Sequence, residues 1–265
     1  MPGRPGRDAD PPKAAPALTQ KETPMPHRLN LRCADCGIRH RAVCARCDET
    51  ELEQLEKIKV YRRYEAGQKI AWAGDPMSFV GSVVSGVATL SQTMEDGRIQ
   101  MVGLLLPSDF IGRPGRDSTP YDVTAASAVT LCCFRRAPFE RLLRETPHVA
   151  ERLLEMTLDE LDAARDWMLV LGRKTARERI ASLLVSVARR ESSFDMAPRT
   201  RDIRLDLPLT REAMSEYLGL TLETVSRQIN QLGRDGVIAL DGKRRIHIPD
   251  LARLNAETGN GSAPA

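Results

Sequence analysis

Residues 209–232 have the sequence LTREAMSEYLGLTLETVSRQINQL, the layout of two short helices joined by a tight turn. Thr210 and Thr221 each stand where a helix needs an N-terminal cap, because a threonine oxygen there accepts a hydrogen bond from a free backbone N–H. Between the helices, Gly219 can take the left-handed conformation that a tight turn requires. Apolar residues recur every three or four positions along the second helix, so one side of it packs inward. The stretch predicts a helix-turn-helix.

The polar face of the second predicted helix carries Glu223, Ser226, Arg227 and Asn230, at positions i, i+3, i+4 and i+7. Every amphipathic helix has a solvated face, so polarity alone indicates nothing. The residue types say more. Arginine can bind N7 and O6 of guanine with two hydrogen bonds, glutamate can accept one from cytosine N4, and serine can bind a base or a phosphate. This set, directly after a glycine turn, favours a helix that binds in the major groove of DNA.

A β-hairpin is predicted directly after the helix-turn-helix. Two β-prone runs, 237–240 and 245–248, flank Asp241-Gly242, a pair typical of two-residue hairpin turns. The hairpin would be the wing of a winged helix-turn-helix, and its basic residues at 243–245 could contact phosphates. The candidate DNA-binding residues are therefore Thr210, Thr221, Glu223, Ser226, Arg227 and Arg244.

Upstream, residues 147–172 predict one long helix. Pro147 suits the first turn, and no proline or glycine follows until Gly172. Apolar or small residues recur there in steps of three and four, typical of the a and d positions of a coiled coil. They are Leu154, Thr157, Leu161, Ala164, Met168 and Leu171. Because the other faces are strongly charged, the pattern favours a parallel dimer over a core helix packed on its own domain.

Between residues 59 and 134 the pattern changes to short β-prone runs separated by turn signals. Runs such as 79–84 and 99–106 are bounded by Gly, Pro, Asp and Ser. Several short strands at such regular spacing predict an antiparallel sandwich or barrel. Helices are expected on either side of this region, over 49–57 and 175–190.

Residues 33–47 have the sequence CADCGIRHRAVCARC and hold four of the six cysteines, the other two being Cys132 and Cys133. A C-x2-C spacing lets two thiolates bind one soft metal centre, because two intervening residues allow both sulfurs to point inward. A disulfide framework is the alternative. Residues 1–30, however, contain no apolar run of signal-peptide length. We therefore expect a cytoplasmic protein, in which clustered thiols stay reduced and bind metal or sense redox state.

Length and composition limit the number of domains and the class of protein. The 265 residues suit about two domains, and 42% hydrophobic with 28% charged residues is typical of a globular protein. Seven prolines in residues 1–30 predict a mostly disordered tail. No stretch approaches the roughly 18 apolar residues of a membrane span. Residues 173–245 hold 15 Lys and Arg against 10 Asp and Glu, which points weakly to nucleic acid.

A β domain, a long helix and a winged helix-turn-helix in this order resemble the CRP/FNR family of bacterial transcription regulators. The motifs LGLTLETVSR (218–227) and KTARER (174–179) are specific to that family, and the resemblance covers residues 31–250. GIRHRAVC (37–44) and GLLLPSDF (103–110) are similar to the FNR oxygen sensors, most closely to their FnrL branch.

The resemblance implies an α+β fold with an antiparallel β-roll like that of cyclic-nucleotide-binding domains. The implied parts are a disordered tail (1–30), a cysteine-rich segment (31–48), the β-roll sensor domain (49–146), the dimerisation helix (147–172), the winged helix-turn-helix domain (173–250) and a C-terminal tail (251–265). By the same resemblance the chain would be a regulator and not an enzyme. It would bind a [4Fe-4S] cluster, dimerise without oxygen, and bind TTGAT-n4-ATCAA-like palindromes to regulate anaerobic or microaerobic genes with RNA polymerase. Glu223, Ser226 and Arg227 would contact the half-site.

The implied cluster ligands are three N-terminal cysteines and one distant cysteine in the β domain. Cys33 and Cys36 match the first pair. Cys44, which the branch motif contains, is the expected third ligand, with Cys47 as its alternative. Cys132 is the expected fourth ligand. Its neighbour Cys133 should face the other side of a strand, because successive side chains alternate.

Other interpretations stay open. A regulator of this fold could hold a structural zinc at Cys33, Cys36, Cys44 and Cys47, since that C-x2-C spacing does not need Cys132, or it could hold no cofactor. An enzyme with cysteine chemistry is a third possibility, although the four histidines are scattered without a ligand or triad pattern.

A cyclic-nucleotide sensor is disfavoured. Nucleotide-binding relatives have a glutamate and a later arginine around the ribose and phosphate. Arg113 and Tyr121-Asp122 stand at those places in this chain.

Overall fold

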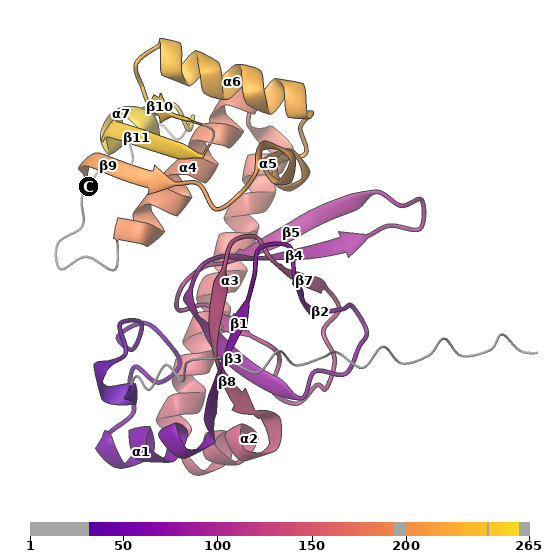
Figure 1. Cartoon of the computed structure of the whole chain (residues 1–265), viewed down its shortest axis with the longest axis vertical. Helices are drawn as coiled ribbons and strands as arrows, with labels where there is room; N and C mark the ends of the chain where they lie inside the picture. The colour runs from indigo at the N-terminus through magenta and orange to yellow at the C-terminus, as the bar shows by residue number, and fades with distance from the viewer. Residues whose placement is uncertain (1–31, 193–199, 243, 260–265) are drawn as a thin grey trace, which may run out of the picture.

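The computed structural model describes residues 32–192, 200–242 and 244–259. Figure 1 shows a β-roll and a smaller C-terminal unit, with one long helix running from one to the other. All strand pairs are antiparallel in the described sheets, so the predicted α+β architecture is confirmed. The tail expected to be disordered, residues 1–30, lies outside the described residues. Within them, no helix has the length and apolarity that crossing a membrane requires.

The β-roll pairs two four-stranded sheets, with the orders β1-β8-β3-β6 and β2-β7-β4-β5. Its strands are β1 (Lys59–Tyr64), β2 (Lys69–Ala71), β3 (Phe79–Ser85), β4 (Ala88–Thr93), β5 (Ile99–Leu105), β6 (Phe110–Ile111), β7 (Asp122–Ala125) and β8 (Val129–Arg135). A core that includes Val83, Val123 and Leu131 fills the space between the sheets. The turn-punctuated region between residues 59 and 134 thus forms the predicted β domain.

Two helices follow the β-roll. The first, α2 (Arg136–Glu145), buries Phe139 and Leu142 against the β-roll and was not foreseen as a separate helix. The second, α3 (Pro147–Arg173), has Pro147 in its first turn and runs for 27 residues, or about 40 Å at about 1.5 Å per residue. The predicted helix over 147–172 is confirmed. It passes along the β-roll and ends beside the C-terminal unit (Figure 1).

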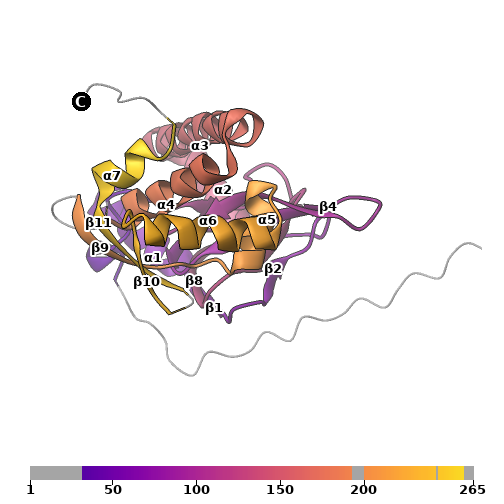
Figure 2. The ribbon, with the colours of Figure 1, turned by 90° about the horizontal axis from the view of Figure 1, so that it is seen from above.

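The C-terminal unit packs helices around a three-stranded sheet of order β10-β11-β9. Its elements are α4 (Ala176–Ser192), β9 (Arg201–Asp206), α5 (Arg211–Leu218), α6 (Leu222–Arg234), β10 (Ala239–Asp241), β11 (Arg245–Asp250) and α7 (Leu251–Ala256). Both helices of the helix-turn-helix and the wing are confirmed. Seen from above, α6 lies across the top of the molecule (Figure 2).

Two elements of this unit differ from the expectation. Residues 251–265 were taken as a tail, but Leu251–Ala256 form a helix that Asp250 caps and that buries Leu251 and Leu254. The strand β9 was missed because charged residues interrupt its apolar pattern. It buries only Ile203 and Leu205, and it gains its backbone hydrogen bonds from β11.

The cysteine-rich segment leads into α1 (Glu49–Ile58), the helix predicted over 49–57. Asp48 and Glu51 form a capping box at its start, and Leu52 and Leu55 are buried. Residues 32–47, called the cysteine loop below, lie beside the β-roll and the first part of α3 (Figure 1).

The C-terminal unit also contacts the rest of the molecule. Gln100 of β5 donates a hydrogen bond of 3.0 Å to the carbonyl of Glu216 in α5. Trp167 of α3 stacks on Tyr217 of α5, with ring centroids 4.4 Å apart. The helix-turn-helix is therefore held against both α3 and the β-roll.

Candidate metal centre and nucleic-acid interface

The cysteine loop is a series of tight turns. The amide of Cys36 donates to the carbonyl of Cys33 at 3.4 Å, which closes the first turn. Ile38, Ala42 and Val43 are buried and anchor the loop on the β-roll. Of the loop cysteines, Cys33 and Cys47 are buried and Cys36 and Cys44 are half-buried.

Four thiols meet at one cavity between the cysteine loop and the β-roll. Three come from the loop and the fourth from β8, nearly a hundred residues away. The lining residues are Cys33, Cys36, Ile38, Ala42, Val43, Cys44, Leu55, Tyr61, Ser82, Cys132 and Phe134. The structure therefore brings together the four cysteines that the sequence predicts as ligands, and Cys47 is not among the lining residues.

The cavity is small and mostly apolar. Its volume of about 20 Å³ is room for about one water molecule. The hydroxyl oxygen of Ser82, on β3, is buried there without a hydrogen-bond partner among the described residues. Also within those residues, no three Cys, His, Asp or Glu side chains converge closely enough to hold a metal ion. The donor set suits a sulfur-ligated group, but a group larger than water needs the loop to move outward.

The two adjacent cysteines of β8 face opposite sides, as the alternation of a strand predicts. Cys132 lies opposite Tyr61 of β1 and Ser82 of β3, and all three line the cavity. Cys133 is buried in the core between the two sheets. Of the pair, only Cys132 is positioned to act at the cavity.

Burial is the largest cause of the raised pKa of Cys33, Cys44, Cys47 and Cys132. It raises the pKa of Cys44 to about 11 and that of Cys47 to about 12. It also raises the pKa of Cys33 and Cys132, although Nζ of Lys59, 3.5 Å from the sulfur of Cys33, opposes the rise there. Protonated thiols are poor nucleophiles, unlike the activated cysteine of an enzyme. A metal centre would displace these protons on binding.

The cysteine loop also bonds directly to the first turns of α3. Arg46 pairs with Glu155 at 2.6 Å. The guanidinium of Arg152 donates to the carbonyl of Arg41 at 2.7 Å. The apolar cluster that contains Cys33 and Cys132 continues into α3 through Val149, Leu153 and Met156. A movement of the cysteine loop would therefore change its contacts with the first turns of α3.

The predicted coiled-coil face of α3 is exposed in the single chain. Leu154, Leu161 and Met168 expose 58%, 44% and 73% of their surface. Thr157 and Ala164 are also exposed, and Leu171 is half-buried. Leu158 and Leu169, which the heptad pattern left out, widen the apolar stripe. So much exposed apolar surface on one helix indicates an interaction site.

The helix-turn-helix has the geometry that its sequence predicts. The hydroxyl of Thr210 accepts from the amide of Ala213, and that of Thr221 accepts from the amide of Thr224. Gly219 takes a left-handed conformation, with φ of 61° and ψ of 42°, which a side chain would strain. The two caps and the turn glycine are confirmed.

The outer face of α6 is largely exposed within the described part of the chain. Val225, Ile229 and Leu232 are buried against the rest of the unit. The side chains of Glu223 and Arg227 are 87% and 60% exposed, with 3.9 Å between their charged atoms. Ser226 is half-buried and Asn230 is exposed on the same face. This face can enter a groove without rearranging the core.

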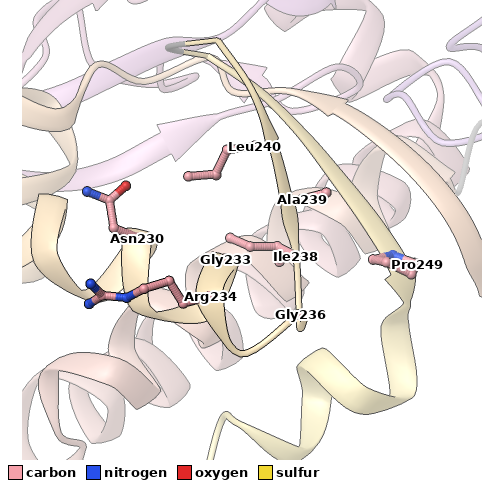
Figure 3. Close-up of a pocket in the computed structure, with 8 residues that line it drawn as sticks. All are labelled: Asn230, Gly233, Arg234, Gly236, Ile238, Ala239, Leu240 and Pro249. Carbon is pink, nitrogen blue, oxygen red and sulfur yellow. The ribbon is translucent and has the colours of Figure 1, made fainter.

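The wing stands beside the C-terminal half of α6. A groove of about 810 Å³ separates them, with Asn230 and Arg234 on the helix side and Ala239 and Leu240 on the wing side (Figure 3). Gly242 forms the hairpin turn with a positive φ of 73°. Arg244 is exposed, and Lys243 lies outside the described residues. The wing can therefore reach a phosphate backbone that flanks α6.

Several residues of the cavity could not be found from the sequence. Tyr61, Ser82 and Phe134 line it, and Lys59 stands beside Cys33. Only the register of β1 and β3 against β8 reveals Tyr61 and Ser82, because it places both opposite Cys132.

Known proteins match most of this chain. Residues 178–257 match the Crp-like helix-turn-helix domain and residues 61–146 the cyclic nucleotide-binding domain. The chain is 65% identical, over 87% of its length and 93% of the relative's, to the transcriptional activator protein FnrL of Cereibacter sphaeroides. It is 28% identical, over 87% of its length and 92% of the relative's, to the fumarate and nitrate reduction regulatory protein of Escherichia coli.

A solved structure has the same fold as this chain. The structure of FixK2 from Bradyrhizobium japonicum superposes with a TM-score of 0.69 at 32% identity, covering 77% of this chain and 100% of that one. The fold, the DNA-binding unit and the sequence identity lead to one conclusion: the chain belongs to the CRP/FNR family of transcription regulators, in its FnrL branch.

Proposed function

We propose that this chain is an oxygen-responsive transcription factor that holds a [4Fe-4S] cluster at Cys33, Cys36, Cys44 and Cys132. The observation that carries the proposal is that these thiols, from two distant parts of the chain, line one cavity. Four cysteine thiolates are a common ligand set for such clusters. The hydroxyl of Ser82, buried there without a partner among the described residues, could donate to sulfur.

A structural zinc is the second candidate. Zinc holds its sulfur ligands at about 2.3 Å, so the four sulfurs must converge on one point. Among the described residues no three such side chains converge in this way, so their spacing does not distinguish zinc from a cluster. A zinc site of Cys33, Cys36, Cys44 and Cys47 would also need Cys47, which is not among the lining residues. The set of cysteines that lines the cavity, with Cys132 and without Cys47, therefore favours the cluster proposal.

A cyclic nucleotide is a poorer ligand for the β-roll. Asp122 pairs with Lys69 at 2.8 Å and accepts from the amide of Ala73 at 2.9 Å. Nucleotide-binding relatives have an arginine at this place, which attracts the phosphate. The carboxylate of Asp122 would repel it. The match to a cyclic nucleotide-binding domain supports the fold of residues 61–146 and not that ligand.

The cysteine loop would connect the cluster to the dimer. A bound cluster would supply an oxygen-labile tie between the loop and β8. The closed cavity holds only about 20 Å³, so the loop thiols would spread when the tie forms. Arg46 and the carbonyl of Arg41 would then shift against Glu155 and Arg152 of α3. A cluster can shift the monomer–dimer equilibrium only if it binds the two states with different affinity. The contacts between the cysteine loop and α3 are where the monomer and the dimer would differ.

The proposed active form is a parallel dimer through the exposed face of α3. Two α6 helices would then meet successive major grooves about 34 Å apart, on sites of the TTGAT-n4-ATCAA type. Glu223, Ser226 and Arg227 would contact bases, and Thr210, Thr221 and Arg244 would lie near phosphates. Contact with RNA polymerase is supported only by the relatives, which include transcriptional activators.

The proposal is tested by metal analysis of the full-length chain purified without oxygen. Wild type and Cys47→Ser should be brown, with about four irons and four sulfides per chain for one [4Fe-4S] cluster held by four cysteines, and should bleach in air. Cys44→Ser and Cys132→Ser should lose the iron, while Cys133→Ser, whose thiol faces the core, should keep it. A colourless wild type with one zinc, unaffected by Cys132→Ser, would exclude the cluster and leave the zinc regulator.

A further inference from the structure

The motif KTARER, residues 174–179, connects α3 to α4 by a short and well-bonded link. Lys174 ends α3, and its amide still donates to the carbonyl of Val170. The amide and the hydroxyl of Thr175 both donate to Glu178, at 2.7 and 2.9 Å. This is a capping-box arrangement at the start of α4. The first turn of α4 is therefore fixed relative to the end of α3.

Arg179 bridges two helix ends. Its Nε donates to the carbonyl of Lys174, at the end of α3, over 2.9 Å. One terminal nitrogen donates to the carbonyl of Leu218, at the end of α5, over 3.0 Å. The last carbonyls of a helix lack partners within the helix and carry partial negative charge, which suits the forked guanidinium cation. The next residue after Leu218 is the turn glycine, so Arg179 ties α3 to the turn of the helix-turn-helix.

Arg177 holds the other end of α6. It pairs at 2.7 Å with Asp235, the C-terminal cap of α6, and at 2.7 Å with Glu257, the cap of α7. Hydrogen bonds from Arg177 lower the pKa of both carboxyl groups, so both remain ionised near neutral pH. Two arginines from the first turn of α4 thus bond to the end of α5, directly before the turn that leads to α6, and to the end of α6.

We propose that Arg179 and Arg177 are positioning residues for DNA recognition, which fix the orientation of α6 relative to α3. The inference rests on DNA binding by the helix-turn-helix and does not need the cluster. Base edges are recognised only by side chains that reach them in the groove, whereas attraction to phosphates is independent of sequence. A tilt of α6 about the end of α3 therefore removes base contacts and leaves much of the non-specific affinity.

The molecule contains its own reporter of this orientation. Trp167 of α3 stacks on Tyr217 of α5, with ring centroids 4.4 Å apart. The chain has one other tryptophan, Trp72, which is in the β-roll and can be replaced by phenylalanine. In that background, tryptophan emission reports how α5 lies on α3.

The test compares Arg179→Gln and Arg179→Lys with the matched control Arg189→Gln in the full-length protein, purified without oxygen. Arg189 is also on α4, and its guanidinium donates to the side chain of Asn255 in α7 at 3.1 Å. Binding is measured at one salt concentration to a duplex carrying TTGAT-n4-ATCAA and to a scrambled duplex. For Arg179→Gln the ratio of the two affinities should fall at least about tenfold, the worth of one good base contact. The ratio should fall less in Arg179→Lys, because an ammonium group can donate to one of the two carbonyls. In Arg189→Gln the ratio should match that of wild type.

The emission of Trp167 should change in Arg179→Gln and stay constant in Arg189→Gln. A purely structural role for Arg179 would lower the melting temperature and leave both the affinity ratio and the emission at low temperature as in wild type, which would overturn the proposal. If Arg179→Gln does not fold, Arg179→Lys decides by the same two readouts. If wild type prefers neither duplex, the proposed DNA site is wrong, and the emission of the variants decides the positioning role alone.

Discussion

Arg227 is the side chain on which base recognition should depend most. It projects from the exposed face of α6, with Glu223 3.9 Å away to orient it. Replacing it by alanine should cost about 1–3 kcal/mol of discrimination between the palindrome and random DNA, the worth of a bidentate contact to guanine. Equilibrium binding of Arg227→Ala to both duplexes at one salt concentration measures this cost.

The charge lost in Arg227→Ala needs its own control. Arg165→Ala removes an exposed arginine that is on α3 and not on α6, and that pairs with Asp162. It should leave the discrimination unchanged. An equal loss of affinity on both duplexes in Arg227→Ala would show that Arg227 contacts only phosphate.

At the scale of single residues, the sequence predicted the four cysteines that line the cavity but not the other residues that line it with them. Alternation along a strand was enough to separate Cys132 from Cys133. Spacing alone could not choose between Cys44 and Cys47, because that choice depends on how the turns of the loop orient each side chain. Tyr61 and Ser82 were invisible because only the pairing of β1 and β3 with β8 brings them to the cavity.

Among the elements, α3 makes the sharpest prediction, because its apolar face is exposed in the single chain. Ala164 belongs to the predicted seam and its neighbour Ala163 does not, while both are exposed. Ala164→Glu should bury a charge in the dimer and shift the protein to monomers, at least about tenfold in dissociation constant. Ala163→Glu should not, because its side chain stays in water.

Sedimentation of the two variants without oxygen tests the seam. Both should fold like wild type, because neither position is buried in the chain. Equal dissociation of Ala163→Glu and Ala164→Glu, or dissociation of neither, would place the dimer interface elsewhere.

Elements were predictable where their signals are local. The caps and glycine of the helix-turn-helix, and the unbroken periodicity after Pro147, each determine structure within a few residues. The strand β9 and the helix α7 lacked such signals. They form because the sheet and core of the C-terminal unit provide hydrogen bonds and apolar contacts from outside the segment.

For the whole molecule, the central prediction is that the thiol site and the dimer are energetically coupled. Cys132→Ser should be monomeric with low affinity for the palindrome. Strengthening the seam with Thr157→Leu and Ala164→Leu in the same chain should restore both properties without the cluster, because a coupled equilibrium can be shifted from either end. Sedimentation and DNA binding of the triple variant in air measure the rescue.

A triple variant that dimerises but still fails to bind DNA would show that the loop acts on the helix-turn-helix by another route. The β-roll and the C-terminal unit are also joined directly, since Arg190 of α4 pairs with Asp109 in the turn after β5. The control adds the same number of leucines outside the seam, by Asp162→Leu and Ala163→Leu. These substitutions should not rescue Cys132→Ser.

The order of the domains followed from the sequence, but the coupling did not. Strand spacing, the heptad pattern and the turn glycine each identify one unit. The bonds from Arg46 to Glu155 and from Arg152 to the carbonyl of Arg41 span more than a hundred residues. No local pattern indicates such contacts, which exist only because the loop and α3 pack on the same side of the β-roll.

The most direct measurement is the sedimentation of wild type before and after exposure to air, with the colour of the same sample recorded. The brown protein prepared without oxygen should sediment as a dimer, and the monomer fraction should rise in step with bleaching. A dimer fraction that stays constant while the colour disappears would contradict the coupling between the four cysteines and α3.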